Sequence, residues 1–158
     1  MAIQFQKASI SDAAELYRMQ IICFQPLLDK YGDVKTNPAA EPLERMESRL
    51  KQDETDYYFI CLEGKRIGAI RVVRLPENVC RISPMFLLPE FQGNGLAQKT
   101  LQEIEALYPQ AVRWTLDTIK EESKLCHLYE KMGYQATGRK ESIQENMTIV
   151  FYEKRTDF

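Results

Sequence analysis

The sequence predicts a single α/β (α+β) domain with about seven strands and about four helices. Its length of 158 residues suits one domain with a sizeable core. The contents of 44% hydrophobic and 28% charged residues are typical of a globular protein. Stretches with strand periodicity alternate with stretches of helical periodicity along the chain, and no internal repeat or low-complexity segment interrupts them. These observations together predict the fold class.

The individual elements follow from periodicity and from capping residues. Alternating or β-branched and aromatic stretches predict strands at residues 3–8, 56–62, 66–74, 79–88, 111–117, 134–140 and 147–155. Apolar residues at helical spacing predict helices from Ser9 or Ser11 to Phe24, from Pro42 to about Leu50, at 97–108 and at 121–132. The last of these helices stops before Gly133, which suits a left-handed C-terminal cap.

Turn chemistry connects these elements. Residues 63–65, Glu-Gly-Lys, predict a hairpin between two neighbouring strands. Residues 25–40 contain Pro26, Gly32 and a second proline, and they predict a long loop of the kind that is often functional. Pro84 lies inside a predicted strand and cannot donate to a ladder. We therefore expect an edge, a bulge or a splayed point near it.

The stretch Pro89-Glu90-Phe91-Gln92-Gly93-Asn94-Gly95-Leu96-Ala97 joins a predicted strand to a predicted helix. Gly93 and Gly95 allow positive φ and let a ligand approach bare backbone. The helix that follows begins with unpaired N–H groups and the positive end of its dipole. These features predict a phosphate-binding turn, and a tight turn without a ligand is the alternative.

Two nucleotide-binding motifs fail at this loop. The Walker loop needs Lys-Ser or Lys-Thr after its last glycine, whereas Leu96-Ala97 follows Gly95. The dinucleotide fingerprint needs a third glycine or alanine where Gln98 stands, and it belongs early in a βαβ unit. The loop therefore matches neither of these nucleotide-binding motifs.

Composition excludes several other classes. The net charge of −2 and the spread of Lys and Arg give no nucleic-acid footprint. The sequence contains no apolar run long enough for a membrane span and no secretory signal, so we expect a cytoplasmic protein that binds no membrane. Its four cysteines lie far apart without a CxxC pair, and His127 is the only histidine. We expect reduced, mostly buried thiols and no metal site.

Two motifs resemble the GCN5-related N-acetyltransferase (GNAT) family. The segment from Gln92 through Gly95 to Ala97 resembles its acetyl-CoA pyrophosphate loop, Q/R-x-x-G-x-G/A, and residues 89–91 match the usual approach to that loop. Residues 128–134, Leu-Tyr-Glu-Lys-Met-Gly-Tyr, resemble the segment that ends the second cofactor-contacting helix. The predicted element order is also the family's. The resemblance implies one GNAT-like domain over residues 1–158, with a mixed, mostly antiparallel sheet splayed at the cofactor loop.

The resemblance also implies a chemistry, namely acetyl transfer from acetyl-CoA to a primary amine of a small molecule or peptide by direct attack in a ternary complex. Tyr129 matches the tyrosine that protonates the leaving thiolate, although its place on an apolar helix face also suits a core tyrosine. The implied cofactor contacts are the loop residues Gln92, Gly93, Asn94, Gly95, Leu96 and Ala97, together with backbone N–H groups of Met85, Phe86 and Leu87. An ordinary edge strand is the alternative for the last three.

Several points stay open at this stage. Asp117 corresponds to a place where relatives hold a general base, but a turn or helix-capping aspartate is the preferred interpretation of it. A water chain is the alternative to a side-chain base. Glu122 stands where the family often has a cofactor-contacting asparagine. The resemblance therefore implies no cofactor contact for this residue. Asp29, Tyr31 and Asp33 in the predicted loop are candidates to receive a cationic amine, with a solvated loop as the alternative.

The sequence does not decide between this function and two rival functions, and it does not determine the oligomeric state. One rival is a non-catalytic acyl-CoA-binding or regulatory module, which Glu122 and the absence of a carboxylate from residues 79–88 favour. The other is an acyltransferase with a longer acyl donor or a hydroxyl acceptor. A homodimer is left open.

Overall fold

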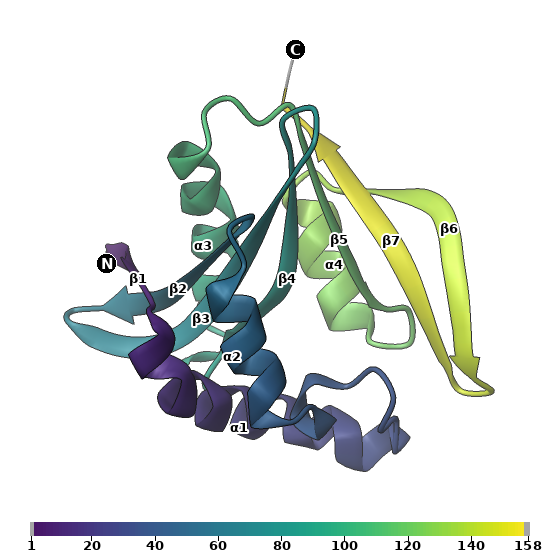
Figure 1. Cartoon of the computed structure of the whole chain (residues 1–158). Coiled ribbons are helices and arrows are strands. Elements are labelled where there is room, and N and C mark those ends of the chain that lie inside the picture. Colours follow the sequence, from purple (N-terminus) through teal and green to yellow (C-terminus); the bar gives the residue numbers. More distant parts are fainter. Residues whose placement is uncertain (1, 157–158) are drawn as a thin grey trace.

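The computed structural model describes residues 2–156, so residue 1 and residues 157–158 of the predicted domain lie outside the described part. Seven strands form one sheet in the order β1-β2-β3-β4-β5-β7-β6 (Figure 1). The strands are β1 Ile3–Lys7, β2 Thr55–Leu62, β3 Lys65–Leu75, β4 Val79–Leu87, β5 Arg113–Ile119, β6 Gln135–Gln144 and β7 Met147–Arg155. The helices are α1 Ala13–Tyr31, α2 Leu43–Lys51, α3 Leu96–Ile104 and α4 Ser123–Lys131. The fold class predicted from the sequence is confirmed.

The sheet opens between β4 and β5. All other neighbouring strands pair antiparallel, whereas β4 and β5 are parallel because α3 carries the chain back between them. Only three residue pairs join them, from Val79↔Arg113 to Arg81↔Thr115. Beyond Arg81 the two strands diverge (Figure 1). The predicted mixed, mostly antiparallel and splayed sheet is therefore confirmed.

Two apolar cores cover the two faces of the sheet. On one face, α1 and α2 bury Leu16 and Met46 against Tyr57 and Phe59 of β2. The larger core on the other face contains side chains of α3 and α4, including Leu101. Strand β2 is buried over most of its length because it lies between the two cores. Helices on both faces therefore hold β4 in place while its edge toward β5 stays open.

The first helix is longer than predicted. Helix α1 passes through Pro26 and ends at Tyr31, and Gly32 caps it with φ 64°. The predicted long loop at 25–40 is therefore wrong, because half of it is helical. The proline removes a single backbone bond on the outer side of the helix, where Ile22 is 51% exposed. Burial of the last turn against the other half of the sheet outweighs that loss, since Tyr31 packs with side chains of β5 and β7.

Other boundaries shift by a few residues. Strand β5 continues to Ile119, the predicted helix at 97–108 ends as α-helix at Ile104, and α4 begins at Ser123. Strand β6 extends to Gln144, further than predicted. Element ends are set by pairing and capping that local periodicity does not contain.

Pro84 lies at an irregularity of the sheet, as predicted. The register between β3 and β4 shifts between Ile70↔Met85 and Val72↔Ile82. Arg71 therefore faces the segment around Ser83 and Pro84 without a regular ladder partner, and its Nε donates to the Ser83 carbonyl. The irregularity occurs at the level where β4 separates from β5.

Within residues 2–156, no helix is both long and apolar enough to cross a membrane. Cys23, Cys61, Cys80 and Cys126 are free thiols. No group of three or more potential His, Cys, Asp or Glu metal ligands occurs among these described residues.

Candidate active site

The open edge of β4 supplies unused backbone groups. The Leu88 N–H donates to the Ile67 carbonyl at 2.8 Å, which turns the backbone of Leu88 toward β3. Hydrogen-bonded and non-bonded pairs alternate in an antiparallel ladder. The register therefore directs the Phe86 N–H toward β3 and the N–H groups of Met85 and Leu87 toward the opening. Two of the three predicted amides face the site.

The Leu87 carbonyl is tied to two neighbouring segments. It accepts a hydrogen bond from Gln92 Nε2 at 2.9 Å and another from Cys23 Sγ of α1 at 3.2 Å. The Gln92 amide therefore anchors the glycine loop to the end of β4 and is not directed outward. Burial raises the pKa of the Cys23 thiol to about 12, and Glu90 adds to the shift. This cysteine is a structural donor in its protonated form.

The loop after β4 forms a concave row of amides. Gly93 and Gly95 have φ values of 80° and 76°, and no other atom lies within 4 Å of where a Cβ would stand on either. Gly95 caps α3 without any side-chain cap, and the first helical bond runs from Lys99 to the Gly95 carbonyl. In the described chain, the six successive amides from Gly93 to Gln98 have no acceptor.

This row of amides fits a pyrophosphate. Several N–H groups without an acceptor in the described chain lie at the positive end of a helix dipole, and the space in front of Gly93 and Gly95 is open. Asn94, Leu96 and Ala97 contribute amides to the row, while the Leu96 side chain is buried beneath it. The predicted loop residues therefore lie together at the end of β4.

Tyr129 lies on the other side of the opening, on α4. Its ring packs against Tyr134 and Tyr152 with centroid distances of 6.1 and 6.4 Å. Burial raises the pKa of Tyr129 to about 12, and Asp117 and Cys126 add to the shift. The Tyr152 hydroxyl donates to Glu130 Oε2 at 2.7 Å, whereas the Tyr129 hydroxyl has no hydrogen-bond partner within residues 2–156. The ring is a core group, and its hydroxyl is not engaged by any residue of the described chain.

Asp117 is part of the sheet at the start of the splay. It lies within β5, and its Oδ2 accepts from Arg81 Nη2 of β4 at 3.0 Å. The alternative of a turn or helix-capping aspartate is therefore wrong. Burial raises the pKa of Asp117 and outweighs the opposing effect of Arg81. A carboxylate with raised pKa near Tyr129 has the chemistry of a general base.

Glu122 is occupied by α1. Its Oε2 accepts from the Tyr31 hydroxyl at 2.6 Å and from Lys30 Nζ at 2.7 Å. Burial by itself would raise the pKa of Glu122, but the hydrogen bonds from Lys30 and Tyr31 outweigh it and lower the pKa. The carboxylate is thus neutralised by its own neighbours, and His127 nearby is exposed.

The three loop residues considered for a cationic amine also have internal partners. Asp29 accepts from Gln25 Nε2 at 2.8 Å, and Tyr31 donates to Glu122. The Asp33 side chain is buried and accepts from the amides of Lys35 and Thr36. The hydrogen bonds within the protein explain the presence of all three side chains without an amine ligand.

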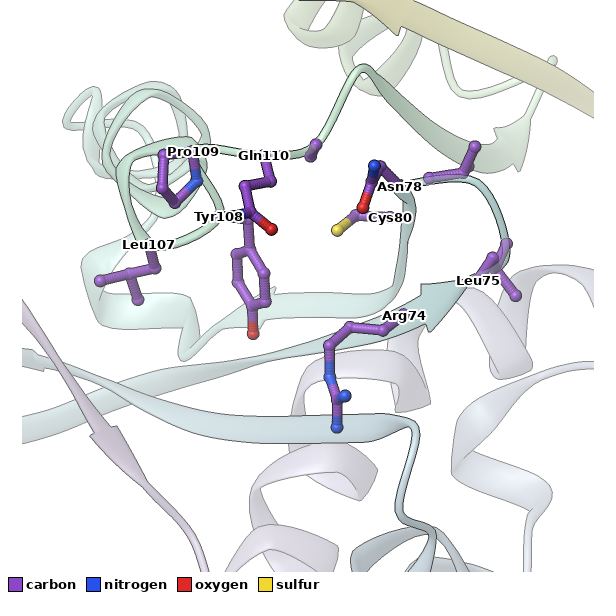
Figure 2. A pocket seen from close by; sticks show the side chains of 10 residues that line it. Arg74, Leu75, Asn78, Cys80, Leu107, Tyr108, Pro109 and Gln110 are labelled. Carbon is purple, nitrogen blue, oxygen red and sulfur yellow. The ribbon is translucent and has the colours of Figure 1, made fainter.

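A cavity of about 380 Å³ lies elsewhere, at the end where β4 and β5 are still paired (Figure 2). Arg74, Cys80, Tyr108 and Gln110 contribute to its lining. The Tyr108 hydroxyl donates to Asp56 Oδ2 at 2.6 Å beside it. This cavity is separated from the glycine loop by the length of β4, so it is not the site described above.

Sequence reasoning missed two arginines of this region, Arg71 and Arg81. Arg81 is the only charged residue of the otherwise largely apolar β4, and this contrast is the signal that could have identified it. Arg71 shares β3 with three other basic residues, so no such signal marked it.

Comparison with protein families identifies the chain. The model of the Acetyltransferase (GNAT) family matches residues 14–134. The chain belongs to the GNAT acetyltransferase family. The match includes both the glycine loop and the helix of Tyr129. No curated protein matches the sequence significantly.

Solved structures share the GNAT fold at low sequence identity. An acetyltransferase from Thermus thermophilus is 15% identical, with 99% of this chain and 98% of that chain covered and a TM-score of 0.75. A ribosomal L7/L12 α-N-protein acetyltransferase in complex with coenzyme A is 12% identical, with 99% and 96% covered and a TM-score of 0.76. The aminoglycoside acetyltransferase AAC(6')-Ib, in complex with ribostamycin and coenzyme A, is 16% identical, with 98% and 94% covered and a TM-score of 0.75.

Proposed function

We propose that this GNAT protein transfers an acetyl group from acetyl-CoA to a primary amine by direct attack in a ternary complex. The observation that carries the proposal is the row of six amides without acceptors, from Gly93 to Gln98, beside the open edge of β4. The GNAT neighbours solved with coenzyme A support acetyl-CoA as the cosubstrate. The four free cysteines suit a reducing compartment, so we place the enzyme in the cytoplasm.

The loop would hold the pyrophosphate of the cosubstrate. Its amides donate to phosphate oxygens, and the α3 dipole adds favourable charge. Gln92 acts indirectly, because its side chain fixes the loop to the Leu87 carbonyl. Lys99 follows in the first turn of α3 and adds a positive charge to this end of the helix.

The open edge of β4 would receive the thioester. Acetyl-CoA supplies an activated acyl carbon, whose bond to sulfur breaks as the amine nitrogen bonds to it. The N–H groups of Met85 and Leu87 face this place and stabilise the negative charge that develops on the carbonyl oxygen. Phe86 supports them from the apolar face, where it stacks edge-on against Phe24 at 5.8 Å.

Two protons must move during the transfer. The departing thiolate takes a proton from the Tyr129 hydroxyl, which its raised pKa keeps protonated at neutral pH. The attacking amine loses a proton to Asp117, directly or through a water chain. Each group is close to the opening between β4 and β5, so the acid and the base approach the same reacting centre.

The test is turnover with acetyl-CoA and a panel of primary amines. Release of the free thiol is followed by a colour reagent, and acetylated products are identified by mass spectrometry. We expect thiol release that depends on the amine, with an acetylated amine as product. Tight CoA binding without turnover on any amine would show a non-catalytic module instead. Turnover only with longer acyl thioesters or with alcohols would show the other rival.

A further inference from the structure

Several arginines on or near the sheet face beneath α1 and α2 are paired with carboxylates, whereas Arg71 is not. Arg49 binds Glu41 through both terminal nitrogens at 2.8 Å, and Arg81 binds Asp117 at 3.0 Å. On β6, Arg139 pairs with Glu141 at 2.9 Å. Arg71 of β3 has no carboxylate within 4.0 Å in the described chain. Arg71 is therefore held by a backbone carbonyl and not by a carboxylate, and Glu41, which already pairs with Arg49 and Arg45, acts on it only at longer range.

The position of Arg71 relates it to the reacting centre. Its Nε donates to the Ser83 carbonyl of β4, and Ser83 precedes Met85 by two residues. Two residues of strand span roughly 7 Å. The guanidinium is thus held about two residues along β4 from the Met85 amide, and its two terminal nitrogens make no hydrogen bond within residues 2–156. The side chain is only partly buried, so solutes reach it.

The surroundings of Arg71 disfavour an isolated positive charge. Burial, together with the positive charges of Arg49 and Arg81, lowers the pKa of Arg71 to about 10, and Tyr57 and Glu41 oppose the shift only in part. The guanidinium nevertheless stays charged at neutral pH. A partly buried cation between two others costs free energy that a bound anion would offset. Strongly perturbed charges in an open site often mark a ligand contact.

We propose that the acceptor amine also carries an anionic group, a carboxylate or a phosphate, which binds the terminal nitrogens of Arg71. The inference rests on the proposed acetyl transfer and names the class of its acceptor. A planar guanidinium with two free donor nitrogens matches either oxyanion in a bidentate manner. Arg81 lies on the same face two residues before Ser83 and adds to the positive field.

The geometry limits the size of this acceptor. Only two residues of β4 separate Ser83 from Met85, so an acceptor that reaches both places is small, such as an amino acid, a short peptide or a phosphorylated amino alcohol. Polycationic acceptors meet the positive charge of Arg71 at the same place, and the repulsion disfavours them.

Matched pairs of acceptors test the proposal without any mutation. Each pair has the same amine with and without the anionic group, such as an amino acid and its carboxamide, or phosphoethanolamine and ethanolamine. We expect the anionic member of at least one pair to have a kcat/KM roughly 10- to 100-fold higher, as a charge-assisted hydrogen bond provides. The amino-acid and phosphate pairs distinguish the two oxyanions. Equal rates within every pair, or a preference for polyamines, would overturn the inference.

Variants then connect the preference to the side chain. Arg71→Met should reduce the ratio of kcat/KM between the anionic and the neutral member of each pair to about one, because the lost interaction favours only the anion. The ratio within one variant cancels any effect of the substitution on turnover of all acceptors. Arg71→Lys should keep part of the preference for the anionic acceptor. Arg18→Met is the matched control, since Arg18 is exposed on α1 and lies away from the β4 edge. Thermal melting confirms that each variant is folded.

The outcomes separate this inference from the proposed function. If the wild type acetylates no amine of the panel, acetyl transfer itself fails. If it acetylates amines and Arg71→Met leaves the preference unchanged, only the role of Arg71 fails.

Discussion

Tyr129 shows how one side chain serves packing and chemistry at once. Its ring fills the core of α4, while its hydroxyl lacks a partner in the described chain. We expect Tyr129→Phe to lower kcat by about 100-fold or more, because loss of a general acid typically costs that much. The affinity for CoA should stay within about twofold, since the amides of the glycine loop are unchanged. Steady-state kinetics and calorimetry measure the two quantities.

Tyr134→Phe is the matched control for that substitution. The Tyr134 hydroxyl is buried without a partner next to Tyr129, so its removal deletes a neighbouring phenol from the same core. Stability should be unchanged or slightly higher, because an unsatisfied polar atom is removed. An equal loss of kcat in both variants would assign the effect to packing and not to proton donation.

The raised pKa of Tyr129 also sets the pH range of its role. A tyrosine with a pKa of about 12 remains protonated above its usual pKa of 10 and ionises only as pH rises through 12. Its contribution to stability is complete below pH 10 and is lost between these two values. Any alkaline fall in kcat below pH 10 therefore belongs to another group.

At the scale of elements, the junction of β4 and α3 forms the glycine loop that we propose as the cofactor site. Gly95→Val places a branched side chain at φ 76° and into the space in front of the amides. We expect the Kd for CoA to rise by roughly 100-fold or more, equivalent to about 2.7 kcal/mol. Calorimetric titration with CoA measures this change. The backbone strain itself should cost about 1–2 kcal/mol of stability.

The Gly138→Val variant separates the effect of backbone strain from the effect of blocking the proposed cofactor site. Gly138 of β6 has φ 92° and also has no atom within 4 Å of a built Cβ, but it lies on the outer edge of the sheet (Figure 1). The two variants should lose similar stability, and only Gly95→Val should lose CoA binding. Normal CoA binding by Gly95→Val would show that the cofactor does not use this loop.

At the scale of the molecule, α1 joins the two halves of the splayed sheet. Its first turns pack with β2, and its last turn packs with β5 and β7. The Glu122 carboxylate fixes this end through Tyr31 and Lys30. We expect Glu122→Gln to lower the free energy of unfolding at pH 7 by about 1 kcal/mol, or the Tm by about 2–4 °C, by weakening charged hydrogen bonds.

This effect should depend on pH in a defined direction. The pKa of Glu122 in the folded state lies below its usual 4.5, so its stabilisation is present above pH 4.5 and is lost as pH falls through the lower value. Calorimetry of wild type and Glu122→Gln should therefore give Tm values that converge in acid. Glu145→Gln, on the exposed β6–β7 turn, should match the wild type at every pH. A constant difference down to strong acid would contradict the assigned interaction.

Much of the fold was predictable because its determinants are local. The periodicity of strands and helices, the β2–β3 hairpin and the irregularity at Pro84 all follow from neighbouring residues. The full length of α1 was not predictable, since its last turn is stabilised by β5 and β7 residues more than 80 positions away. The pairing of Asp117 with Arg81 was missed for the same reason, as 36 residues separate them.

The sequence by itself determined the glycine loop, the order of the elements and the family of the protein. Backbone freedom at Gly93 and Gly95 and the start of a helix after them are properties of adjacent residues. Only the tertiary structure decided which groups remain available to a ligand. It turns Met85 and Leu87 outward, engages Gln92 and Glu122 internally and leaves Arg71 without a carboxylate from residues 2–156. Availability depends on partners brought together by folding, and those partners are distant in the chain.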